Sequence, residues 1–260
     1  MAAPYSFGFM GNGITRCVVL ALPSSAVSAM LPAGLDLGRQ NLTPEGTHPL
    51  ILQFHRFSEC QFSFPTFLQS MNFHEQTVGI PFAYVRPGYG LPGGSGPYYF
   101  MPKLYLDDLW VLLNGRVWWG FNKEITSVQA SDCRYTVTSL AGRRLVSLEW
   151  SVLGDADARP VNGSAEWERH RQMLNQTLIS GTPASAGIFF SLTDFDRRWN
   201  LSTARPLRSV LEVDPAYLPG FEGGRFTASG QGGIDSPVLA SFELCGPWWL
   251  SLPYQRLFPE

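Results

Sequence analysis

The chain has 260 residues, a mass of 28.9 kDa and a formal net charge of -2, and 45% of its residues are hydrophobic. This composition is sufficient to bury a large core, and all-β folds of this length are often undivided, so we expect a single domain over residues 1–260. The charge provides no basic surface for nucleic acid, which excludes that class of partner.

The spacing of the cysteines and histidines argues against disulfide bonds and a metal-binding site. The four cysteines are widely spaced and form no Cys-x-x-Cys pair, so we expect reduced thiols and a cytoplasmic protein. The four histidines share no spacing typical of metal ligands, so no metal site is expected. No apolar run approaches the roughly twenty residues of a membrane span, and no basic segment of a signal peptide is present, so no membrane partner is expected. The residues concerned are Cys17, Cys60, Cys133, Cys245, His48, His55, His74 and His170.

The first part of the chain is predicted to consist of strands and turns. Residues 14–22 form an apolar stretch typical of a strand. Pro23-Ser24-Ser25 then has the character of a cap before a short helix at 26–31, which Pro32 ends. Further strands are predicted at 49–56, 77–85 and 98–107.

The second part continues the strand pattern around one clear helix. The apolar stretch 109–113 is predicted as a strand. Residues 164–174 place Trp167, His170 and Leu174 at helical spacing, which predicts a short amphipathic helix. More than ten short strands with two brief helices indicate a mainly β, single-domain fold. The other strands of this part include 125–130, 134–140, 144–153, 207–213 and 247–252.

Lys103 and Lys123 are the only two lysines among 19 basic residues. A guanidinium stays protonated and cannot form an imine, whereas a desolvated ammonium can lose its proton and attack a carbonyl. Lys123 follows the apolar run 118–121, where an ammonium is poorly hydrated, so we expect it to be a nucleophile of the Schiff-base type. The alternative is a surface lysine at the end of a strand.

Four short segments around Lys123 and Glu75 form a distinctive pattern: LYLDD at 104–108, GR at 115–116, GFNK at 120–123 and EQTVGIP at 75–81. Together they resemble the motifs of the acetoacetate decarboxylase superfamily. The resemblance implies that Lys123 is the Schiff-base residue and Glu75 a catalytic acid/base. It also implies a curved, cone-like β-barrel whose interior holds the lysine.

Three positions depart from the family pattern. Asn122 replaces a proline, Glu124 replaces a second lysine, and Val117 replaces an acidic residue. If the segment is extended, Glu124 points away from the face of Lys123, and desolvation then activates the lysine. With Trp118 and Trp119 nearby, these changes predict a cavity that favours a substrate larger and more apolar than acetoacetate.

Four residues are candidates for substrate binding. The family uses an N-terminal arginine for the substrate carboxylate, and Arg16 lies in the corresponding region. Arg116 is an alternative, although it could instead form a structural ion pair with Asp107 or Asp108. Trp119, from the aromatic run, is expected to line the site. Tyr254 could supply an acid/base hydroxyl, or it could be a structural tyrosine.

The chemistry expected at Lys123 leaves three functions open. An iminium formed with a ketone lowers the barrier to breaking an adjacent carbon–carbon bond, so the first is decarboxylation of a β-keto acid. The second is an aldolase-dehydratase that uses the same intermediate, and the third is a non-catalytic barrel that binds a small apolar ligand. We expect a keto acid or ketone as the partner, no cofactor, and a homo-oligomer.

Overall fold

The computed structural model describes residues 8–63, 70–88, 95–153, 157–162, 165–181, 190–229 and 238–257, except for the side chains of 165, 166 and 255–257. Most of these residues lie in strands, which confirms the mainly β prediction. The strands are β1 Gly8–Pro23, β2 Leu35–Leu37, β3 Thr47–Phe62, β4 Met71–Val85, β5 Tyr98–Phe100, β6 Leu104–Leu106, β7 Lys123–Ile125, β8 Ser127–Ala130, β9 Arg134–Thr138, β10 Arg144–Val152, β11 Arg159–Pro160, β12 Leu178–Ser180, β13 Phe190–Thr193, β14 Phe195–Asp196, β15 Thr203–Val213, β16 Gly224–Ser229, β17 Val238–Ser251 and β18 Gln255–Leu257. The helices are α1 Ser24–Ser28, α2 Leu109–Trp119 and α3 Ala165–Leu174.

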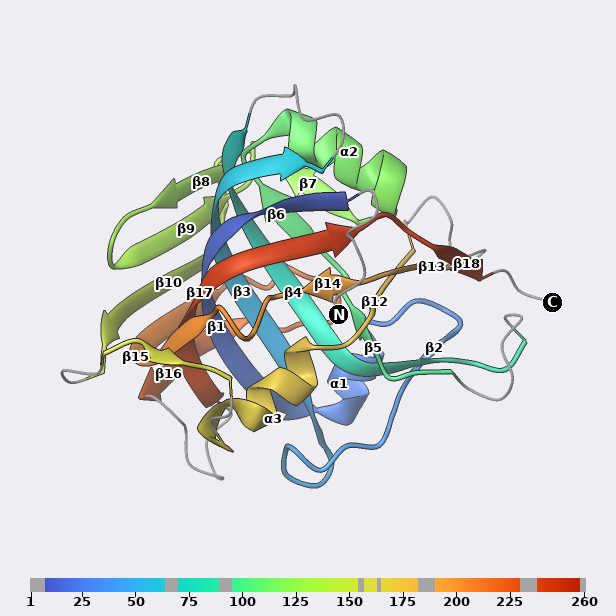
Figure 1. Ribbon diagram of the computed structural model, residues 1–260. Helices are drawn as coiled ribbons and strands as arrows, with labels where there is room; N and C mark the ends of the chain where they lie inside the picture. Colours follow the sequence, from blue (N-terminus) through green and yellow to red (C-terminus); the bar gives the residue numbers. More distant parts are fainter. Residues whose placement is uncertain are drawn as a thin grey trace.

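The sheet is built around β1, which pairs antiparallel with β3 on one side and β17 on the other. From β3 the sheet continues through β4 to β6, and β6 pairs in parallel with β7. From β17 it continues through β15 to β10, β9 and β8. In Figure 1 the long strands curve across the molecule, with α2 at the upper end and α3 at the lower end.

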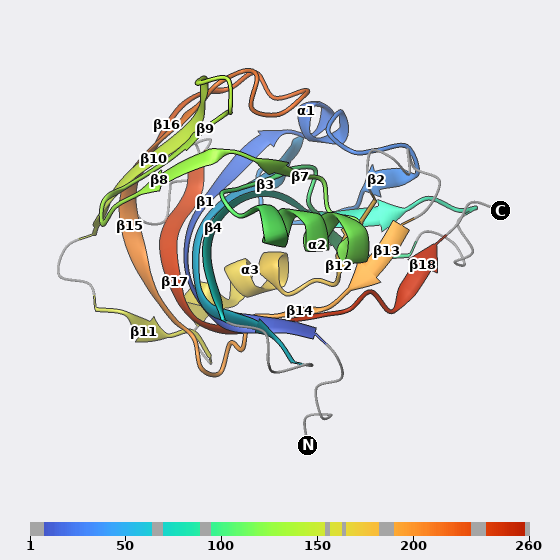
Figure 2. The same cartoon turned by 90° about the horizontal axis from the view of Figure 1, so that it is seen from above.

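The two faces of the long strands are buried in two different cores. In β1, Val18 and Leu20 belong to one apolar cluster, whereas Cys17 and Val19 belong to the other. This division follows from the period of two in a strand, which sends successive side chains to opposite faces. Figure 2 shows the sheet curving around α2 and α3, whose buried apolar side chains belong to the second cluster. The curvature of the sheet therefore creates a concave face, on which α2 and α3 lie.

The prediction of a strand at 109–113 is wrong, because these residues begin helix α2. The carboxylate of Asp108 caps the helix by accepting a hydrogen bond from the Val111 backbone N–H at 2.8 Å. Gly120 ends it in the left-handed region at φ 69°, a conformation that glycine adopts without strain. Between this cap and this glycine, the helix has apolar side chains on nearly every side. The 3.6-residue periodicity that predicts an amphipathic helix is therefore missing from its sequence.

Other boundaries differ in detail. The strand predicted at 49–56 extends from residue 47 to residue 62, and the one predicted at 98–107 is split into β5 and β6. The short N-terminal helix begins two residues earlier than expected, and residue 164 of the second predicted helix lies outside the described residues. Within the described ranges, no helix is both long and apolar enough to span a membrane.

Candidate active site

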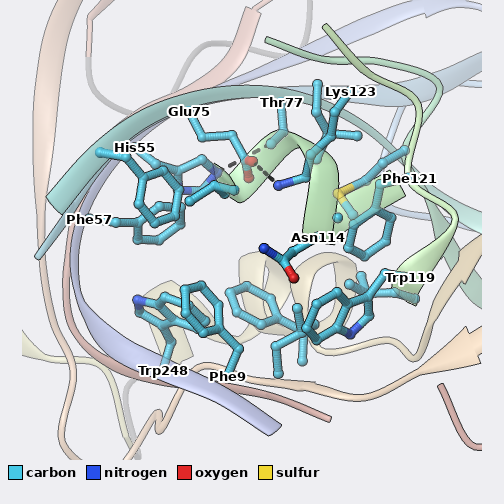
Figure 3. A pocket seen from close by; sticks show the side chains of 18 of the residues that line it. Phe9, His55, Phe57, Glu75, Thr77, Asn114, Trp119, Phe121, Lys123 and Trp248 are labelled. Atoms are coloured by element: carbon cyan, nitrogen blue, oxygen red, sulfur yellow. Dashed lines mark hydrogen bonds and ion pairs between the residues drawn. The ribbon is translucent and has the colours of Figure 1, made fainter. Parts of the chain in front are cut away.

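Lys123 and Glu75 form a buried ion pair on the concave face of the sheet. The Lys123 Nζ atom lies 2.5 Å from Glu75 Oε2, and the residues are only 5% and 7% exposed. Both line a cavity that α2 covers from one end. Figure 3 shows the pair on one side of this cavity, Phe9 and Trp248 on the opposite side, and Asn114 of α2 between them.

Strand pairing brings these two residues together across 48 positions of sequence. Glu75 of β4 lies opposite Leu106 of β6, and Lys123 of β7 lies beside Leu104 two residues away on the same strand. Residues two apart on a strand share a face, so both charged groups point to the concave side. The sheet therefore places the two residues of the family motifs in direct contact.

Gly115 and Arg116 of α2 position Lys123. A Cβ atom on Gly115 would lie 2.3 Å from Lys123 Cε, so only a residue without a side chain leaves room for the lysine. The Arg116 guanidinium donates to the Lys123 carbonyl oxygen, from Nε at 2.9 Å and from Nη2 at 2.5 Å. Arg116 does not line the cavity, and it does not form the ion pair with Asp107 or Asp108 that the sequence left open.

Glu124 lies on the other side of β7, where its carboxylate pairs with Lys103 at 2.5 Å. Val117 and Trp118 are 71% and 57% exposed on α2 and do not line the cavity. The explanation of an apolar preference through Glu124, Val117 and Trp118 is therefore wrong. Glu124 and Val117, two of the three altered positions, face away from the lysine.

The apolar wall of the cavity comes instead from aromatic residues of many elements. Trp119 is among them, and its Nε1 atom donates to the Ser251 carbonyl oxygen at 2.6 Å. The cavity volume of about 80 Å³ compares with the roughly 10–15 Å³ that one water needs. The aromatic lining residues are Phe9, Phe57, Phe62, Phe73, Tyr99, Trp110, Trp119, Phe121, Phe195 and Trp248.

His55 lies in the polar part of the cavity lining. Its Nδ1 atom is 2.8 Å from Thr15 Oγ1, and its Nε2 atom is 3.3 Å from Thr77 Oγ1. Burial, and then the positive charges of Arg197 and Lys123, hold the pKa of His55 well below its ordinary value. His55 is therefore neutral near pH 7. Among the described residues, no three His, Cys, Asp or Glu side chains gather in a way suited to a metal ion.

Arg16 lies outside the cavity, on the opposite face of β1. Its guanidinium pairs with Glu243 at 2.9 Å and lies 4.4 Å from the Trp150 ring centroid. The alternation of the strand explains this placement, because its neighbour Thr15 is the residue that contacts His55 on the cavity side. In this arrangement Arg16 does not reach the space beside Lys123.

Tyr254 is also outside the cavity lining. It is 56% exposed, and its hydroxyl donates to Asp194 Oδ1 at 3.3 Å. The structure therefore brings together Lys123, Glu75 and Trp119 of the predicted site residues, but not Arg16, Arg116 or Tyr254.

Arg197, Gln53 and Asn114 line the cavity without having been singled out from the sequence. Gln53 carried a usable signal, because it and His55 interrupt an apolar strand at alternate positions. Arg197 carried none. It lies in the polar sequence after β14, and only the tertiary structure places it at the cavity.

A curved β sheet with a buried lysine–glutamate pair in an aromatic cavity is typical of a protein that binds a small molecule. The acetoacetate decarboxylase (ADC) family matches residues 7–192, so this chain belongs to that family. No curated protein matches the chain.

Solved structures support the same fold. Acetoacetate decarboxylase from Legionella pneumophila has a TM-score of 0.59 and 14% identity, with 99% of this chain and 92% of that chain covered. An acetoacetate decarboxylase-like enzyme from Sphingomonas wittichii RW1 has a TM-score of 0.53 and 14% identity, with 98% and 93% covered. The enduracididine biosynthesis enzyme MppR, in complex with pyruvate, has a TM-score of 0.53 and 13% identity, with 99% and 91% covered.

Proposed function

We propose that this protein is an imine-forming carbon–carbon lyase that decarboxylates a β-keto acid through Lys123. The observation that carries the proposal is the contact of the Lys123 ammonium with the Glu75 carboxylate at 2.5 Å inside an aromatic cavity. Proton transfer from the ammonium to the carboxylate yields the neutral amine that attacks a carbonyl. The short contact allows this transfer without water.

The proposed reaction proceeds through one iminium. The Lys123 amine adds to the ketone carbon and water leaves, which forms a carbon–nitrogen double bond. The carbon–carbon bond to the carboxylate then breaks, and its electron pair moves toward the iminium nitrogen. Carbon dioxide departs, and an enamine remains on Lys123. A proton returns to the enamine carbon, and water releases the ketone product. Glu75 is the proposed carrier of these protons, and the imine is the electron sink, so we propose no cofactor.

An aldolase-dehydratase is the second candidate, because the same enamine can attack an aldehyde. A structural neighbour supports it: MppR has been described in complex with pyruvate and with the condensation product of pyruvate and imidazole 4-carboxaldehyde. In either reaction, we propose that the aromatic lining favours a substrate more apolar than acetoacetate, at roughly 25 cal/mol for each Å² of apolar contact.

Reductive trapping tests the proposal. Borohydride with a β-keto acid, or with pyruvate, should leave a covalent mass on Lys123, and a Lys123→Met variant should lose it while Lys103→Met retains it. Products then separate the two reactions, since decarboxylation releases carbon dioxide and aldol condensation consumes an aldehyde. Labelling of Lys103, or of neither lysine, contradicts the proposal, and the second result favours a non-catalytic binding barrel.

Substrate preference is a separate measurement. The value of kcat/KM should be higher for an aryl-bearing β-keto acid than for acetoacetate, because the aromatic wall supplies contacts that the smaller molecule leaves unfilled. A clear preference for acetoacetate contradicts the role proposed for the wall.

We also propose that residues 1–260 act as one domain in a cytoplasmic homo-oligomer. Free thiols at all four cysteines support the compartment. An apolar face of α2 supports self-association, since its side chains are 47–71% exposed. A monomeric mass by light scattering contradicts the oligomer. The residues of this face are Leu109, Trp110, Leu113, Val117 and Trp118.

A further inference from the structure

Arg197 is a buried cation in the same cavity as Lys123. It is 6% exposed, and its Nη2 atom donates to Gln53 Oε1 at 2.7 Å. Its guanidinium carbon lies 4.5 Å from the Phe195 ring centroid. The Nε atom is buried and, within the described part of the chain, has no hydrogen-bond partner. The neutral Gln53 amide is thus a weak substitute for the anion that a buried guanidinium requires.

Within the described residues, no carboxylate compensates this charge. Glu75, the acidic residue of the cavity lining, is bonded to Lys123. Cys17 and Tyr99 are close enough to interact with Arg197, but burial raises the pKa of both, to about 12 for Cys17, so both are neutral. Burial in turn lowers the pKa of Arg197 from its ordinary value. The charged groups of the cavity are therefore one carboxylate and two cations.

The two cations approach the cavity from different parts of the sheet. Arg197 bonds to β3 and also lines a smaller adjoining cavity with residues of β1 and β17, including Thr15 and Leu244. Lys123 lies on β7, beyond β4 and β6 in the strand order. His55 of β3 interacts with both positive charges. The two cations therefore provide a ligand with two contact points, one bonded to β3 and one on β7.

We infer that Arg197 binds the substrate carboxylate while Lys123 engages the carbonyl, so that the site selects keto acids over neutral ketones. The inference rests on the proposed function for the role of Lys123. A guanidinium has five donors and binds a carboxylate through paired hydrogen bonds, which suits this task better than a point charge. Arg197 lies beyond residues 7–192, the part of the chain that the family match covers, so the assignment comes from this structure.

Binding of an unreactive acid tests the inference without any imine. Calorimetry compares 3-phenylpropanoate with its neutral amide, 3-phenylpropanamide, neither of which carries a ketone. The wild-type protein should bind the acid roughly 10- to 100-fold more tightly, as expected for charge-assisted hydrogen bonds. Arg197→Gln should abolish this preference. The matched control is Arg198→Gln, because Arg198 pairs with Asp196 at 3.3 Å and does not line this cavity, and it should retain the preference.

Equal affinity of the wild-type protein for acid and amide overturns the inference, even if Arg197→Gln does not fold. Arg197→Lys provides a second variant, which keeps the charge and should keep part of the preference. Loss of the preference in Arg198→Gln also overturns it, since a general surface charge is then responsible. A protein that prefers the acid but yields no borohydride adduct retains the Arg197 site and loses the proposed lyase function, so the two failures are distinguishable.

Discussion

The two lysines of this protein form ion pairs of equal length in opposite surroundings. Lys123 and Glu75 are 2.5 Å apart with side chains 7% and 10% exposed, whereas Lys103 and Glu124 are 2.5 Å apart with side chains 20% and 42% exposed. Lys123 and Glu124 are neighbours on β7. One face of this strand therefore carries a member of the first pair, and the opposite face carries a member of the second. The contacts are alike, but Lys123 and Glu75 line the aromatic cavity and Lys103 and Glu124 do not. Burial and access to a ligand, rather than the ion pair itself, therefore distinguish a candidate active site.

Replacing the carboxylates should separate the two pairs most strongly. Glu75→Gln should lower kcat by about 10²–10⁴-fold, the usual contribution of a general acid/base, because the amide cannot accept the ammonium proton. Imine trapping on Lys123 should persist in part. Glu124→Gln should leave kcat unchanged. Full turnover by Glu75→Gln, measured in steady state, contradicts its proposed role.

The loss of folding stability on replacing each lysine should also distinguish the two ion pairs. Lys123→Met leaves the Glu75 carboxylate buried and unpaired, which should lower the free energy of unfolding by about 3–5 kcal/mol. Lys103→Met should lower it by only about 0–1 kcal/mol, because that pair is screened by solvent. Urea denaturation measures both values, and a double-mutant cycle with Glu75→Leu isolates the buried interaction. Equal losses at the two lysines refute the distinction.

Replacing Gly115 tests the position of Lys123 without changing any charge. Gly115→Ala places a methyl group against Lys123 Cε, so the lysine must move from Glu75, and turnover should fall by about 10²-fold. The helix itself should tolerate alanine, which has a higher helix propensity than glycine. Val117→Ala, on the exposed side of α2, is the control and should keep full activity. Normal kinetics in Gly115→Ala indicate that the lysine does not need this position.

The smallest expected effect is on His55. Lys123 is one of the positive charges that hold its pKa below the ordinary value, although burial is the larger cause. Lys123→Met should therefore raise the pKa of His55, and the freed Glu75 carboxylate adds to the rise. Lys103→Met should leave it unchanged. Titration of the imidazole resonances by NMR measures the change, and an unmoved resonance in Lys123→Met shows that the ammonium does not act on the ring.

The local sequence was sufficient to predict the strands that have strong apolar or alternating patterns. It was insufficient to predict helix α2, because the apolar residues 109–113 indicated a strand. Asp108 and Gly120 are a good capping pair, but they are recognisable as such only when the segment between them is already read as helix. Periodicity fails there because most residues of the helix are apolar, on its exposed side as well as on its buried side.

The sequence by itself determined the mainly β class, the family and the two residues of its motifs, Lys123 and Glu75, because those signals are local. Only the tertiary structure decided which charges share a cavity. Arg16 was expected beside the lysine, but strand alternation turns it toward Glu243, and Arg197 arrives from a loop 74 residues after Lys123. A side chain's face depends on strand register, and its neighbours depend on how far the sheet curves. Neither property is encoded in any short stretch of the chain.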